Sequence, residues 1–94
     1  MIELFLSTGK ENARTRQTLC MLTGLKDRQV RQEIEDLRNQ GVFVVNDEDG
    51  NGYYITEDIN TLSRQYRKDT ARAMSILKRR KHIRKYLKER GVEV

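Results

Sequence analysis

Four neighbouring polar side chains, about a third of the way along the chain, carry the groups best suited to contact the edge of a base. They are Arg28, Gln29, Arg31 and Gln32. A guanidinium can donate two parallel hydrogen bonds to guanine, and a carboxamide can pair in the same bidentate way with adenine. Their spacing places all four in the first two turns of one helix, so we expect them to enter the major groove of duplex DNA.

The acidic residues that follow allow a second interpretation of the same helix. Glu33, Glu35 and Asp36 come directly after the basic and amide side chains. Phosphates repel carboxylates, so either these side chains point away from DNA or this helix does not read DNA. In the second case Arg31 and Glu35 form an ordinary exposed i, i+4 ion pair.

The densest positive charge lies near the C-terminus. Binding of nucleic-acid phosphates is the preferred interpretation of this cluster. A solvated helix end that complements the helix dipole, or a surface for membranes or acidic proteins, are the alternatives. The basic cluster consists of Lys78, Arg79, Arg80, Lys81, Arg84, Lys85 and Lys88.

Two further arginines lie close to the start of a predicted helix. Backbone amides at such a position often meet DNA phosphates, and Arg14 and Arg16 would add positive charge there. We expect both to contact the DNA backbone, with solvated loop charges as the alternative.

The net charge of the 94-residue chain is unevenly divided. The total is +5, but residues 1–63 hold 7 Lys and Arg against 11 Asp and Glu, a balance of −4. Residues 64–94 hold 12 Lys and Arg against 3 Asp and Glu, a balance of +9. The C-terminal third therefore has the character of a polyanion-binding segment or of a solvated helical face.

The sequence contains no set of residues with the types and spacing of a catalytic or metal site. No nucleophile with a base and an orienting group, no paired acids and no cofactor fingerprint can be assembled, so we expect no enzyme and no cofactor. The one cysteine, Cys20, cannot form an internal disulfide, and the one histidine, His82, lies among basic residues. We therefore expect no metal site.

Two short helices separated by a glycine are predicted between Thr15 and Gln40. Thr15 is a suitable N-cap, the apolar Leu19 and Leu22 have the spacing of an amphipathic helix, and Gly24 ends it. The small side chain of Cys20 would allow the two helices to approach.

The second of these helices has a clear apolar stripe. Asp27 is the expected N-cap, and Val30, Ile34 and Leu37 recur at i, i+4 and i+7. Two helices joined by a short turn around a glycine match a helix-turn-helix.

A β-hairpin follows this pair of helices. Apolar residues 42–45 and 53–55 flank a polar, glycine-rich tip at 46–52. The tip presents three acids, Asp47, Glu48 and Asp49, which we expect to be exposed, and no lysine or arginine. Hairpins that enter a minor groove usually carry basic side chains, so this one should stay off the phosphates or meet a basic protein.

Helix, turn, helix and hairpin in this order resemble the winged helix-turn-helix family over residues 2–57. The run GLKDRQVRQEIEDLRNQGV resembles the recognition helix of small winged-helix proteins encoded by bacteria and their phages. The resemblance implies a winged helix-turn-helix domain at 1–57. Together with the basic helix expected at 58–94, the predicted fold class is mainly α with a β-hairpin, a winged helix-turn-helix followed by a long C-terminal helix.

The C-terminal segment is predicted to be one long helix from about residue 58 to 90. Thr56 is the expected cap, a break at 78–81 is allowed for, and the helix would be about 50 Å long at 1.5 Å per residue. Part of its apolar stripe needs cover, and a second copy of the chain is the simplest partner. The expected dimerisation residues are Ile59, Leu62, Tyr66, Ala73 and Leu77.

The sequence favours a small, dimeric DNA-binding regulator, or a phage-type accessory protein, whose partner is duplex DNA. The rival is a winged-helix protein-interaction module that docks through its acidic hairpin and long helix. No segment is long and apolar enough to span a bilayer and no signal segment is evident, so we expect a cytoplasmic protein in a bacterial cell, or in the host cell if phage-encoded.

Overall fold

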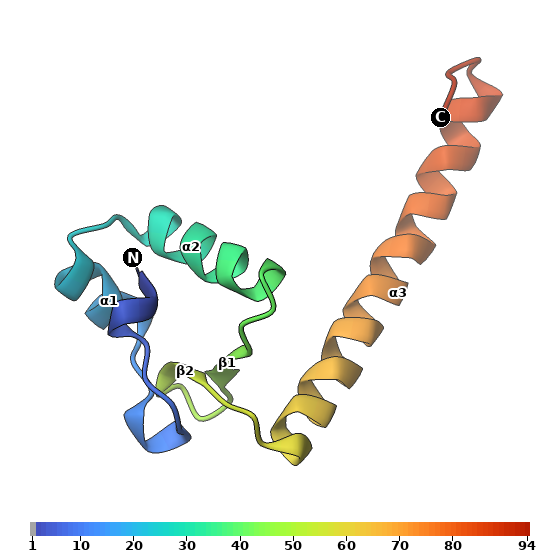
Figure 1. The fold of residues 1–94 in the computed structure, drawn as a ribbon. Helices are drawn as coiled ribbons and strands as arrows, with labels where there is room; N and C mark the ends of the chain where they lie inside the picture. Colours follow the sequence, from blue (N-terminus) through green and yellow to red (C-terminus); the bar gives the residue numbers. More distant parts are fainter. Residues whose placement is uncertain (1) are drawn as a thin grey trace. The chain divides into compact units, whose positions relative to one another are not determined.

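The computed structural model describes residues 2–94, which form helices and one β-hairpin (Figure 1). The prediction of a mainly α chain with a hairpin is confirmed. By their contacts the residues form two compact units, one ending at Leu62 and one starting at Ser63. The elements are the 3₁₀ helices η1 (Ile2–Phe5) and η2 (Lys10–Asn12), then α1 (Arg16–Thr23), α2 (Asp27–Asn39), β1 (Val44–Asp47), β2 (Gly52–Ile55) and α3 (Ile59–Glu89).

The first helix, α1, begins and ends at the predicted residues. The Thr15 hydroxyl accepts a hydrogen bond from the Thr18 N–H at 3.1 Å, and Gly24 ends the helix in the left-handed region at φ +75°. Of the two residues at the amphipathic spacing, Leu19 is fully buried but Leu22 is 46% exposed. Leu22 lies about 60° around the helix from Leu19, and this short helix buries only a narrow stripe.

The second helix, α2, packs through the predicted stripe but starts differently. Val30, Ile34 and Leu37 are all buried. The N-cap is Lys26, whose N–H donates to Oε1 of Gln29 at 2.9 Å, so the prediction of Asp27 as the cap is wrong. Asp27 is the first helical residue, where its carboxylate still complements the positive end of the helix dipole.

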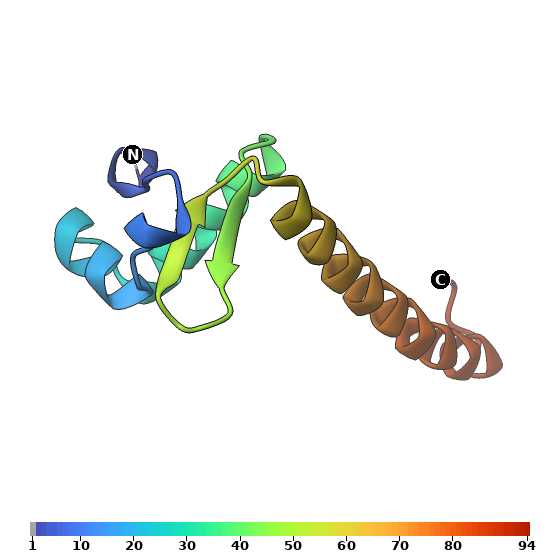
Figure 2. The ribbon, with the colours of Figure 1, turned by 90° about the horizontal axis from the view of Figure 1, so that it is seen from below.

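Strands β1 and β2 form an antiparallel hairpin (Figure 2). Val44 pairs with Ile55, and Asp47 pairs with Gly52. The first strand begins two residues later than predicted and includes Asp47. Val45 and Tyr54, which pair across the strands, are buried on the face opposite Val44. The hairpin therefore buries side chains from both of its faces.

Residues 7–14, which contain η2, line the free edge of β2. The Ile55 N–H donates to the Ser7 carbonyl at 3.0 Å, and the Gly9 N–H donates to the Ile55 carbonyl at 3.0 Å. Arg14 and Tyr53 exchange two backbone hydrogen bonds, at 3.0 and 2.7 Å. These contacts satisfy backbone groups that an edge strand would otherwise expose.

The core lies between η1, α1, α2 and the hairpin. Arg38 joins the end of α2 to β1, because its Nε donates to the Val44 carbonyl at 3.0 Å and its guanidinium lies 5.8 Å from the centre of the Tyr53 ring. Phe5, Leu25 and the half-buried Cys20 pack at the edge of the core. The buried cluster comprises Ile2, Leu6, Leu19, Val30, Ile34, Leu37 and Val44.

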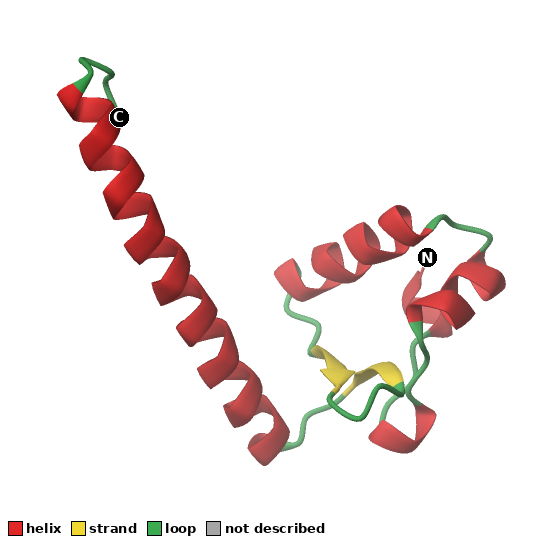
Figure 3. Ribbon diagram, turned by 180° about the vertical axis from the view of Figure 1, so that it is seen from behind, coloured by secondary structure: helices red, strands yellow, loops and turns green. Residues whose placement is uncertain are grey.

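The third helix, α3, is continuous over 31 residues, and the break allowed for at 78–81 is absent (Figure 3). Asp58 caps it, accepting hydrogen bonds at Oδ2 from the Thr61 N–H at 2.9 Å and the Thr61 hydroxyl at 2.7 Å. Thr56 instead accepts from the Asp58 N–H at 3.0 Å, so the expectation that Thr56 caps the helix is corrected. None of the residues of α3 is buried.

Candidate nucleic-acid interface

The outer face of α2 carries the four side chains that the sequence assigned to base contacts. Arg28, Gln29, Arg31 and Gln32 are all exposed, while Val30 between them is fully buried. The buried stripe therefore fixes which side of α2 faces the solvent. Arg28 and Gln32, one turn apart, lie on the side directly opposite this stripe.

Three of the four side chains already have partners within the chain. Oε1 of Gln29 accepts from the Lys26 N–H, and Nε2 of Gln32 donates to Asp36 Oδ1 at 3.0 Å. Arg31 pairs with Asp27, with Nε and Oδ2 at 3.2 Å. Within residues 2–94, Arg28 forms no hydrogen bond or ion pair. Arg28 is therefore the donor of this face that a ligand can engage without displacing another contact.

Asp27 is placed between two arginines that the sequence assigned to DNA. Its Oδ1 lies 2.7 Å from Nε of Arg16, while its Oδ2 meets Arg31. The side chains of Tyr53 and then of Asp27 raise the pKa of the Arg16 guanidinium. The expected Arg31–Glu35 pair is not formed, because Asp27 takes Arg31 and Glu35 lies 3.7 Å from Arg38. A phosphate at this face would have to compete with the Asp27 carboxylate.

Arg14 is directed into the unit. Its Nη1 donates to the Phe5 carbonyl at 3.0 Å, and the residue is half-buried. The sequence grouped Arg14 with Arg16 as contacts to the DNA backbone. In the structure the two guanidinium groups hold different parts of the fold, η1 in one case and the start of α2 in the other.

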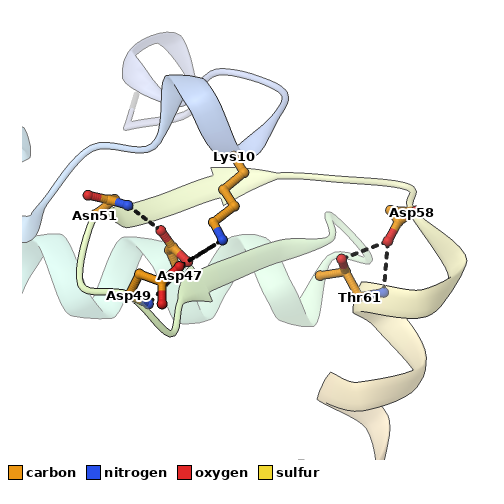
Figure 4. A network of polar contacts seen from close by, with 6 residues as sticks. All are labelled: Lys10, Asp47, Asp49, Asn51, Asp58 and Thr61. Carbon is orange, nitrogen blue, oxygen red and sulfur yellow. Dashed lines mark hydrogen bonds and ion pairs between the residues drawn. The ribbon is translucent and has the colours of Figure 1, made fainter.

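The hairpin tip is organised by a buried acid (Figure 4). The Asp47 side chain is only 4% exposed, so the expectation of three exposed acids is wrong for this one. Asp47 accepts from Asn51 Nδ2 at 2.7 Å and from the Asp49 N–H at 3.2 Å. Lys10 reaches across from η2, with Nζ 3.5 Å from Asp47 and 2.9 Å from Asp49. The acidic tip is thus neutralised in part by a lysine that is distant in sequence.

These contacts lower the pKa of Asp47 and raise the pKa of Lys10. Burial pulls the pKa of Asp47 upward, but hydrogen bonds from Asp49 and Asn51 and the charge of Lys10 outweigh it, so the pKa lies below its usual value. The Asp49 hydrogen bond and the Asp47 charge raise the pKa of Lys10. The stability that the Asp47 carboxylate contributes is lost as the pH falls through the lowered pKa of Asp47. The stability that the Lys10 ammonium contributes is lost as the pH rises through the raised pKa of Lys10. Both contributions are fully present between about pH 4 and pH 10.

Replacing Asp47 with Asn is expected to lower the thermal unfolding midpoint by about 5 °C at neutral pH. An amide in this place removes the attraction to Lys10 and keeps only one acceptor oxygen, so either the Asp49 N–H or Asn51 Nδ2 loses its acceptor. Asp49→Asn is the matched control, because Asp49 is 71% exposed and should matter less. Thermal unfolding from pH 3 to pH 7 measures both variants, and D47N should also lose part of the acid sensitivity. Equal midpoints for the two variants would refute a structural role for Asp47.

The basic cluster on α3 is fully accessible. All seven side chains of the cluster are exposed, and within the described part of the chain none of them forms a hydrogen bond or an ion pair. Ile83 and Leu87 mark the strip of this helix that lacks bases. An Arg90 guanidinium lies 4.8 Å from the centre of the Tyr86 ring, just beyond the cluster. The cluster therefore has no internal partner that a polyanion would have to replace.

The expected dimerisation residues lie on the same helix. Ile59 is 78% exposed, Tyr66 is 73% exposed and Leu77 is 51% exposed. Ala73 is also exposed, and Leu62 is half-buried. The apolar stripe is thus open along most of its length.

Sequence reasoning missed the two polar networks that shape these surfaces. The Arg16–Asp27 and Lys10–Asp47 contacts follow no local spacing rule, since their members meet only after folding. The Arg31–Asp27 contact is an i, i+4 pair, so helical spacing could have indicated it. Among residues 2–94 no group of three or more His, Cys, Asp or Glu could hold a metal ion, and no helix is long and apolar enough to cross a membrane.

Comparison of the chain with models of known protein families, with curated proteins and with solved structures finds no match.

Proposed function

We propose that the protein is a small DNA-binding regulator of the winged helix-turn-helix type. In this proposal α2 reads duplex DNA, the hairpin is the wing, and α3 supplies self-association and affinity for phosphates. No catalytic step is part of the function. The observation that carries the proposal is the exposure of Arg28, Arg31 and Gln32 on α2, on the side that the buried stripe turns away from the core.

The outer face of α2 carries side chains that can form directional hydrogen bonds with base edges, which a surface of positive charge alone cannot do. Arg28 offers a planar guanidinium with no competing partner in the described chain, and Gln32 offers a carboxamide one turn later. Such groups give bidentate hydrogen bonds in the major groove, which carry sequence information. Lys and Arg contacts to phosphates, as proposed for α3, carry none. The two units thus supply the two separate ingredients of specific binding.

The acidic hairpin tip fits this proposal only as a wing that stays off the DNA. It has no basic side chain, and its buried acid is used to bind Lys10. The tip therefore acts as a structural element that supports β2 and the segment beside it.

Replacing Arg28 with Ala is expected to remove about 1–3 kcal/mol of discrimination at one base pair, with little change in nonspecific affinity. A preferred duplex is first selected from a random pool, and fluorescence anisotropy is then measured on it and on single-base variants. Asn39→Ala is the matched control, because Asn39 is exposed at the other end of α2. An unchanged base preference in R28A would show that α2 does not read DNA.

A protein-interaction module is the second candidate, and exposed apolar side chains favour it. Leu4 is 81% exposed and Met21 is 79% exposed, in η1 and α1 respectively. In this case no duplex sequence would be enriched from the random pool. A partner would instead require these side chains and the acids of the hairpin tip.

A further inference from the structure

The apolar stripe of α3 contains two charged residues at positions where a coiled coil would bury apolar side chains. Read with a 3.5-residue period, the seam of this helix runs through Tyr66, Asp69, Ala73, Ile76, Arg80 and Ile83. The steps between them alternate between three and four residues, as in the a and d positions of a heptad. All six are exposed, and Tyr66, Ile76 and Ile83 are 73%, 46% and 55% exposed respectively.

The order of these residues is symmetric about one point of the helix. That point lies between Met74 and Ser75. Ala73 and Ile76 lie next to it on either side, and Asp69 lies as far before it as Arg80 lies after it. Tyr66 and Ile83 form the next symmetric pair, followed by Leu62 and Leu87.

We propose that α3 associates with a second copy of itself as an antiparallel coiled coil centred between Met74 and Ser75. This inference rests on the self-association in the proposed function and goes beyond it by fixing the direction and register of the two helices. In this arrangement Asp69 of each chain faces Arg80 of the other, and Ala73 faces Ile76. Two identical ion pairs therefore flank a small apolar centre.

A parallel arrangement of the same helices would bring like charges together. Asp69 would face Asp69, and Arg80 would face Arg80, inside the seam of the dimer. Like charges in facing seam positions oppose association, whereas opposite charges fix register and partner direction. The charge pattern thus selects the antiparallel dimer against the parallel one. It also explains why both charged residues interrupt the stripe at symmetric places.

A charge-swap series tests the facing pair by sedimentation equilibrium of the full chain without DNA. Asp69→Arg and Arg80→Asp should each weaken dimerisation by at least about tenfold, because each replaces two attractive pairs with two repulsive ones. The double variant D69R/R80D should return to within about threefold of the parent, since both pairs are restored with reversed sign.

Matched controls carry the same charges outside the seam. Lys78→Asp and Glu89→Arg alter the net charge as R80D and D69R do, but they lie on the outer face of the seam's heptads. They should change dimerisation by less than about threefold. A double variant as weak as the single ones, or controls as damaging as the seam variants, would overturn the proposed pairing.

Cysteine cross-linking tests direction independently of charge. In a Cys20→Ser background, chains carrying Tyr66→Cys are mixed with chains carrying Ile83→Cys in a glutathione redox buffer. The antiparallel register places residue 66 opposite residue 83, so mixed disulfides should dominate. Two copies of residue 66 would then be about 25 Å apart along the seam, since 17 residues rise by 1.5 Å each.

Three results would contradict the proposal. Predominant disulfides between two chains that both carry Tyr66→Cys would show a parallel dimer, and an absence of any cross-link above a monomeric control would show that this seam is not an interface. A monomeric parent chain at high micromolar concentration would show the same. DNA binding is measured separately by anisotropy, so loss of dimerisation with retained DNA binding would contradict only the coiled coil.

Discussion

Replacing Gly52 with Ala is expected to lower the free energy of unfolding of the N-terminal unit by about 3 kcal/mol or more. Gly52 has φ +104°, a conformation that residues with a Cβ rarely adopt. A Cβ here would also overlap the backbone carbonyl of Arg14 and the backbone nitrogen of Thr15. These atoms cannot easily move, because the Arg14 carbonyl accepts from the Tyr53 N–H at 2.7 Å.

Gly50→Ala separates the two causes of this loss. Gly50 also has a positive φ, +85°, but an added Cβ would meet nothing within 4 Å. The backbone strain alone should cost about 1 kcal/mol. Urea unfolding of the full-length variants measures both values. Similar losses for G50A and G52A would mean that the close approach of β2 to the start of α1 does not contribute to stability.

Neutralising the seven bases of the basic cluster with glutamine is expected to weaken binding to every duplex alike. If about half of them contact phosphates, the slope of log affinity against log salt should flatten by roughly three units, and affinity near 0.1 M salt should fall by about a thousandfold. Base preference should remain, because phosphate contacts carry no sequence information. Anisotropy titrations over a range of salt concentrations provide the measurement.

Two further variants make this result specific. Arg80 belongs both to the basic cluster and to the proposed seam, so a variant that keeps Arg80 and changes the other six bases tests phosphate contacts without altering the ion pair. Neutralising the four bases earlier in α3 tests whether charge at any place on the helix is sufficient. A salt slope that is unchanged by the seven substitutions would exclude the basic cluster from DNA binding. The four earlier bases are Arg64, Arg67, Lys68 and Arg72.

Local patterns in the sequence predicted the helices and the hairpin well. Val30, Ile34 and Leu37 follow the helical period, and the buried stripe of α2 confirms them. Thr15 and Gly24 predicted both ends of α1, since the cap contacts of this helix join residues that are close in sequence. The winged-helix identity of this arrangement and its DNA contacts stay predictions.

Features that depend on distant contacts could not be predicted in the same way. Nothing near Asp47 indicates that Lys10 will cover it, and the pairing of residues 7–14 with β2 depends on how the whole unit closes. Asp27 looked like an N-cap because Asp is a common cap. In the structure Gln29 accepts from the Lys26 N–H, while Asp27 binds Arg16 and Arg31. Several residues can satisfy a helix end, and tertiary contacts decide among them.

The absence of buried residues along α3 has a thermodynamic consequence. A helix with no fully buried side chain gains little from packing to offset the conformational entropy lost when its backbone is ordered. Its order then depends largely on helix propensity and on the Asp58 cap. Any partner that covers this helix would therefore also hold its ends in order, where a helix without packing opens most readily. Part of the interaction free energy is used for this ordering, so contact with a partner would be weaker, and more readily reversed, than the length of the helix suggests.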